Sequence, residues 1–75
     1  MLKIHFFHSG ARRFCYNDNL FVVEEITHHS LSRICTVKAK SKGNYITLFL
    51  KEIRVDKKNR DHYFSIEKNA PAVSL

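Results

Sequence analysis

The chain has 75 residues, 44% of them hydrophobic, and a formal net charge of +6 at pH 7. This length allows one domain with one small core, and six Phe and three Tyr exclude a disordered or low-complexity chain. No run of residues approaches the ~20 apolar residues of a membrane span, and residues 1–7 lack the layout of a signal peptide. We therefore expect a cytoplasmic protein that does not bind membranes.

The positive charge lies in the second half of the sequence. Residues 1–32 contain equal numbers of basic and acidic side chains, whereas residues 33–60 contain nine Lys or Arg against one Glu and one Asp. A local excess of cations attracts polyanions. The expected partners are therefore nucleic acid or an acidic protein surface.

The first part of the chain predicts three extended segments. Residues Leu2–Phe6 alternate between apolar and polar side chains, which is typical of a strand. Ser9 and Gly10 form a plausible tight turn, after which residues 12–16 return as a second strand. Residues 17–19, Asn-Asp-Asn, favour another turn, and residues 20–26 form the third extended segment.

Residues 27–42 are compatible with two interpretations. In a helix, Thr27 would be the N-cap, and apolar side chains at 31, 34 and 35 would share one face. In a strand, Cys35, Val37 and Ala39 would point to one side, and residues 41–44 would form a hairpin turn. We predict a short helix over residues 27–35, with the strand as the alternative.

The remaining segments predict a central strand and its partner. Residues 45–50 are apolar on both faces, which indicates a strand covered on both sides with Phe49 in the core. Over the following residues the face carrying Ile53 and Val55 is expected to stay buried while the opposite face leaves the core. A polar loop over residues 57–60 leads to a last strand at 62–66.

These elements together predict a small α+β domain over residues 1–67. It would contain about five mostly antiparallel strands and one short helix near residues 27–35. A small all-β barrel of six strands is the alternative. Residues 68–75, which contain Pro71 and several small residues, are expected to form a flexible C-terminal tail.

The cysteines and histidines do not form a recognisable reactive site. Cys15 and Cys35 are isolated in the sequence, so we expect reduced thiols, at least one of them packed in the core. The five histidines lack the paired ligand spacing of a zinc site, and we expect no metal and no cofactor. His62 beside a basic loop has the ingredients of an RNA-cleaving site. A chain with five histidines and 13 Lys or Arg produces such a neighbourhood by chance, and it has no glycine-rich phosphate loop, so we expect no enzymatic activity.

The candidate binding residues are cations and tyrosines of the second half of the chain. They are Lys38, Lys40, Lys42, Lys51, Arg54, Lys57, Lys58, Arg60, Tyr45 and Tyr63. Cations neutralise phosphates, and aromatic rings on a sheet stack against unpaired bases. The sequence thus favours a small non-enzymatic protein that binds RNA or single-stranded DNA through a face formed by residues 38–60.

A second hypothesis belongs to a different functional class. The chain could be a small protein-binding inhibitor or adaptor, of the type that phages and mobile elements encode. It would dock on an acidic face of a host protein or of a nucleic-acid-processing protein. An unpaired edge strand at residues 2–7 would also allow a homodimer.

Overall fold

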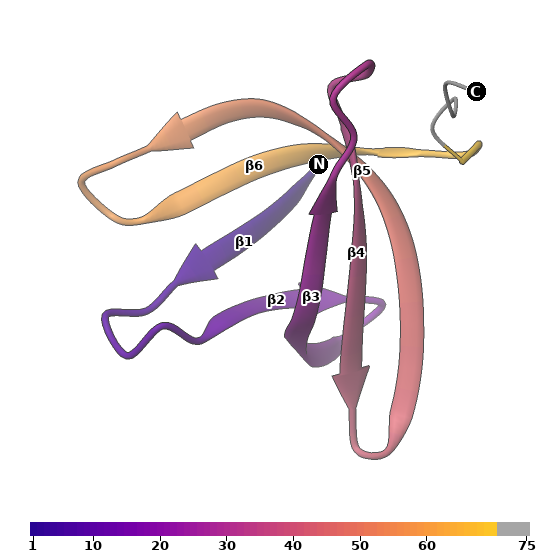
Figure 1. The fold of residues 1–75 in the computed structure, drawn as a ribbon. Helices are drawn as coiled ribbons and strands as arrows, with labels where there is room; N and C mark the ends of the chain where they lie inside the picture. The colour runs from indigo at the N-terminus through magenta and orange to yellow at the C-terminus, as the bar shows by residue number, and fades with distance from the viewer. Residues whose placement is uncertain (71–75) are drawn as a thin grey trace.

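The computed structural model describes residues 1–70, which form six antiparallel strands and no helix (Figure 1). The strands are β1 (Leu2–Phe6), β2 (Arg12–Tyr16), β3 (Asn19–His28), β4 (Ile34–Ser41), β5 (Asn44–Asp56) and β6 (Asp61–Glu67). Each strand pairs with the next along the chain, and β6 pairs back with β1 to close a barrel. The prediction of an α+β domain is therefore wrong, and its all-β barrel alternative is confirmed.

The segment predicted to be a helix consists of the end of β3, a loop and the start of β4. The β3–β4 ladder runs from Val22↔Lys40 to His28↔Cys35, and residues 29–33 connect the two strands. Leu31 is 70% exposed, so the side chains at 31, 34 and 35 do not form a buried face. The β-type alternation of residues 35, 37 and 39, all buried, decides the conformation because it fills the core and completes the ladder.

The core lies inside the barrel and receives alternate side chains from every strand. Ile4, Val37 and Leu50 are fully buried at its centre. Because a barrel has only one inner face, β5 is not covered on both sides as predicted. Its outward Tyr45 is exposed, and Phe49 is half-buried on the outer surface opposite Thr36 rather than in the core.

Two β-bulges bend the long strands and allow the sheet to close. One lies between Val23 and Glu25 in β3, and the other between Glu52 and Arg54 in β5. A bulge inserts one extra residue and increases the local bend. β5 accordingly pairs with β4 over residues 44–51 and with β6 over residues 49–56. Ile53 is the extra residue and is 57% exposed, so the expectation that its face stays buried is wrong.

Tight turns connect the hairpins where the sequence supplies turn residues. Asn17 and Asp18 have φ values of 49° and 62°, and Lys42 and Gly43 have φ values of 50° and 82°. Two consecutive residues with positive φ match the twist of the flanking strands. The turn at residues 17–19 was predicted, and the turn at residues 41–44 belonged to the strand alternative for residues 27–42. Residues 68–70 follow β6 without regular structure, and the rest of the predicted flexible tail lies outside the described residues. Over residues 1–70 no helix is present that could cross a membrane.

Candidate functional site

The candidate binding residues lie in two groups, one at each end of β5. The β4–β5 cluster consists of Lys38, Lys40, Lys42 and Tyr45. The β5–β6 cluster consists of Arg54, Lys57, Lys58, Arg60 and Tyr63. Lys51 lies between them on β5 and is exposed. In Figure 1 the β4–β5 turn and the β5–β6 loop project in different directions, because β5 bends at its bulge.

In the β4–β5 cluster the register places cations and an aromatic ring on one outer face. Lys40 is paired with Tyr45 and Lys38 with Thr47 across the two strands, and paired Cβ atoms in such a ladder lie about 5 Å apart. Tyr45 is 70% exposed. Glu25 of β3 is paired with Lys38 and accepts a hydrogen bond of 3.2 Å from Thr27. Lys38 thus has an acidic residue opposite it on β3, whereas Lys40 is paired with Val22.

In the β5–β6 cluster the tyrosine is already in contact with a cation. The Arg54 guanidinium carbon lies 4.0 Å from the centroid of the Tyr63 ring, in cation–π geometry. This contact covers one face of the ring. A base that stacked on that face would first have to displace Arg54, so Tyr63 is less suited to stacking than Tyr45.

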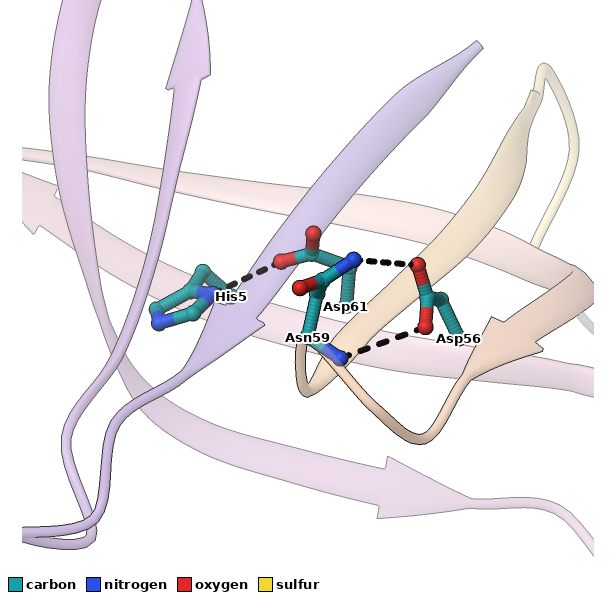
Figure 2. Close-up of polar contacts among 4 residues, drawn as sticks. All are labelled: His5, Asp56, Asn59 and Asp61. Carbon is teal, nitrogen blue, oxygen red and sulfur yellow. Dashed lines mark hydrogen bonds and ion pairs between the residues drawn. The ribbon is translucent and has the colours of Figure 1, made fainter.

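The loop of the β5–β6 cluster is shaped by hydrogen bonds to one carboxylate (Figure 2). The Asn59 side-chain amide and backbone N–H donate to the two Asp56 oxygens at 2.8 and 3.2 Å. These hydrogen bonds lower the pKa of Asp56 below its usual value, since they stabilise the ionised carboxylate. The loop therefore holds its three cations on a defined turn rather than on a free segment.

A buried carboxylate lies next to this loop and is held by a histidine (Figure 2). Asp61 is only 8% exposed, and its Oδ1 atom lies 2.7 Å from His5 Nδ1. Because a carboxylate only accepts hydrogen bonds, the His5 Nδ1–H is the donor. The His5 ring makes an edge contact with Phe7 at 4.4 Å, and Arg13 lies over the Phe7 ring at 5.0 Å.

Arg13 is a surface cation that the sequence-based site did not include. One outer row of the barrel can be followed through the strand registers. It contains Asp61, His5, Arg13, Val22, Lys40 and Tyr45. Neighbouring strands lie ~4.8 Å apart, so Arg13 lies about 10 Å from Lys40. The alternation of residues 12–16 could have placed Arg13 on the outer surface, but only the register brings it near Lys40.

The other titratable residues considered in the sequence lie apart from both clusters or have structural contacts. His62 Nδ1 lies 3.1 Å from Glu52, and the His62 ring packs 4.2 Å from Phe6. Both cysteines are free, with Cys15 exposed and Cys35 in the core as expected for at least one of them. Burial, with a smaller contribution from Glu52, raises the pKa of the Cys35 thiol. Within residues 1–70 no three His, Cys, Asp or Glu side chains are grouped to hold a metal ion.

No protein-family model matches the chain, and comparison with curated proteins and with solved structures gives no match.

Proposed function

We propose that the chain binds single-stranded nucleic acid, RNA or DNA, without catalysis, through the β4–β5 cluster together with Arg13. This proposal rests on the exposure of Tyr45. Tyr45 is 70% exposed, lies opposite Lys40 and does not belong to the core. An exposed aromatic ring flanked by cations supplies both the stacking platform and the phosphate contact that single-strand binding uses.

The arrangement suggests how a strand of nucleic acid would lie. Lys38 and Lys40 are two residues apart on the outer face of β4, so their Cα atoms are ~6.7 Å apart. A sugar–phosphate backbone that follows β4 would meet both ammonium groups and then Lys42 at the turn. One base would stack on Tyr45, while Arg13 lies two strands away toward β2.

Binding would be measured by fluorescence anisotropy with labelled fifteen-nucleotide oligo(U) and oligo(dT). Loss of a stacking ring weakens binding by about 5- to 150-fold, so we expect this effect for Tyr45→Ala. Tyr45→Phe retains the ring and should bind like the wild type. Tyr63→Ala is the matched control, since its ring is covered by Arg54. Equal affinities for Tyr45→Ala and the wild type would contradict the proposal.

The inhibitor or adaptor hypothesis is favoured by a different surface. Ile53 and Val55 are exposed on β5 on either side of Arg54, and an apolar pair among cations suits an acidic protein face. A pull-down from host extract, with and without nuclease treatment, separates the two functions. Under the second hypothesis one nuclease-resistant protein is retained by the wild type and lost with Ile53→Asp. Retention by both proteins would contradict a role for this surface.

A further inference from the structure

The wall of the barrel is incomplete between β1 and β2. Their ladder contains only Phe6↔Arg12 and His5↔Arg13. The next two positions of this register, Ile4 with Phe14 and Lys3 with Cys15, do not continue the ladder. Both strands nevertheless continue, β1 along β6 and β2 along β3. Figure 1 shows β1 and β2 diverging away from the loop that joins them.

This separation leaves backbone groups of both strands facing the gap. Peptide groups along a strand point alternately to its two neighbours. Phe6 N–H donates to the carbonyl of Arg60 beside β6 at 2.9 Å, so Leu2 and Ile4 also point toward β6. The N–H and C=O of Lys3 therefore face the gap, and those of Cys15 face it from β2. Unpaired strand edges of this kind can add another strand.

The gap forms a groove of about 520 Å³ with apolar walls and two cations. It is lined by Met1, Lys3, His5, Phe7, Arg13, Phe14, Cys15 and Leu20. The side chains of Met1, Phe7 and Leu20 are all exposed, although they are large and hydrophobic. Binding clefts for small ligands and peptide side chains have volumes in this range.

We propose that this groove binds an extended acidic peptide segment by strand addition. The backbone of the peptide would pair with the free peptide groups of Lys3 or Cys15. Alternate side chains of an added strand share one face. Those on the outer face would place carboxylates beside Lys3 and Arg13 and apolar side chains beside Phe7 and Leu20. Arg13 is already positioned by its contact with the Phe7 ring, which reduces the entropy lost on binding.

Charge decides between this occupant and the two alternatives. A second copy of the chain would bring its own Lys3 and Arg13 to the interface, so like charges would face each other, and each copy carries a net charge of +6. The phosphates of a nucleic acid would neutralise Lys3 and Arg13. The nucleic acid would not supply the alternating N–H and C=O groups that strand edges pair with. An acidic peptide satisfies both features of the groove.

The probes are fluorescein-labelled heptapeptides in which Glu and Leu or Phe alternate over positions one, three, five and seven, which share one face of a strand, with Ser between them. Binding would be measured by anisotropy and by alkylation of the exposed Cys15, with the buried Cys35 as internal reference. At saturation we expect slower Cys15 alkylation and slower hydrogen exchange of the Lys3 or Cys15 amide. Methylation of the peptide nitrogen that pairs with Lys3 or Cys15 removes one backbone hydrogen bond and should weaken binding by about 2- to 13-fold.

Matched variants locate the binding in the groove. Arg13→Glu should weaken binding by about 10- to 150-fold, since a charge-assisted hydrogen bond is replaced by repulsion. Lys58→Glu makes the same charge change in the β5–β6 loop and should bind like the wild type. The double variant Lys38→Gln/Lys40→Gln should also retain peptide binding, which separates this site from the proposed nucleic-acid site.

Four results would overturn the proposal. The first is that none of the acidic peptides binds. The second is that Arg13→Glu and Lys58→Glu weaken binding equally. The third is that the Lys3 and Cys15 amides become protected from hydrogen exchange when the protein concentration alone is raised, which would assign the groove to a second copy. The fourth is that oligo(dT) protects Cys15 from alkylation as well as the peptides do even in Lys38→Gln/Lys40→Gln, which would assign the groove to nucleic acid.

Discussion

The two clusters at the ends of β5 can be distinguished by neutralising two lysines in each. Lys38→Gln/Lys40→Gln removes the outward cations of β4, and Lys57→Gln/Lys58→Gln removes two cations of the β5–β6 loop. Each double variant lowers the formal net charge from +6 by two charges. The general attraction for a polyanion therefore changes equally, and any difference between the variants reports on direct phosphate contacts.

The size of the difference follows from counterion release. For single strands the slope of log K against log salt is about −0.7 for each neutralised phosphate, so losing two contacts changes the slope by about 1.4. Between 50 and 200 mM salt, the loss of affinity should be about sevenfold smaller for Lys38→Gln/Lys40→Gln than for the wild type. Lys57→Gln/Lys58→Gln should retain the wild-type slope.

The assay is anisotropy of labelled oligo(dT) at five salt concentrations, with urea unfolding of each variant as the control for folding. Lys38 and its neighbour Glu25 are both exposed. Neutralising Lys38 should therefore lower the free energy of unfolding by at most ~1 kcal/mol. Three identical slopes would refute the assignment of phosphate contacts to the β4–β5 cluster. A reduced slope for Lys57→Gln/Lys58→Gln alone would assign them to the other cluster.

Three further expectations concern the barrel itself. Leu50→Ala opens a cavity at the centre of the core and should lower the free energy of unfolding by about 2–5 kcal/mol; a loss below ~1 kcal/mol in a urea titration would be inconsistent with its burial. His5→Leu leaves the Asp61 carboxylate without its hydrogen-bond donor and should cost about 1–3 kcal/mol, part of which Asp61→Leu in the same chain should restore. The raised pKa of Cys35 means that its contribution to stability is complete below the unfolded thiol pKa of about 8.5 and is lost as the pH rises through the folded pKa. Unfolding of the wild type should therefore depend more steeply on pH above about 8.5 than unfolding of Cys35→Ala, and equal slopes would contradict the assignment.

Most strands could be predicted because alternation is a local property of the sequence. The predicted strands at residues 2–6 and 12–16 agree with β1 and β2, and the one predicted at 62–66 lies within β6. The tight turn at residues 17–19 agrees for the same reason, since Asn and Asp tolerate positive φ wherever they occur.

The helix prediction is wrong because it rests on residues close together in the sequence, whereas the observed strand is determined by pairing with distant residues. Thr27 and the spacing of residues 31, 34 and 35 are compatible with one helical face. The ladder with β3 and the burial of Cys35 depend on strands elsewhere in the chain. Leu31, which the helix prediction places on the apolar face, lies in the loop that connects β3 and β4. Tertiary pairing overrode a weak local preference.

The candidate site could be predicted in composition but not in arrangement. The sequence identified a cationic segment, residues 38–60, but could not show that a bulge in β5 divides it into two clusters. The position of Arg13 near Lys40 depends on the registers of three ladders. The groove depends on where one ladder stops, which no local pattern encodes.

The ladder between β1 and β6 has a kinetic consequence. The other five ladders join consecutive strands, and hairpins of this kind form within about 1–10 μs. The last ladder joins residues 2–5 to residues 61–64. Relative to the longest hairpin connections of this barrel, which have about five residues, closing so long a segment costs roughly 2 kcal/mol more entropy. Closure is thus the expected bottleneck of folding. Because β1 is one wall of the groove, the peptide site is assembled only in molecules that have passed this step.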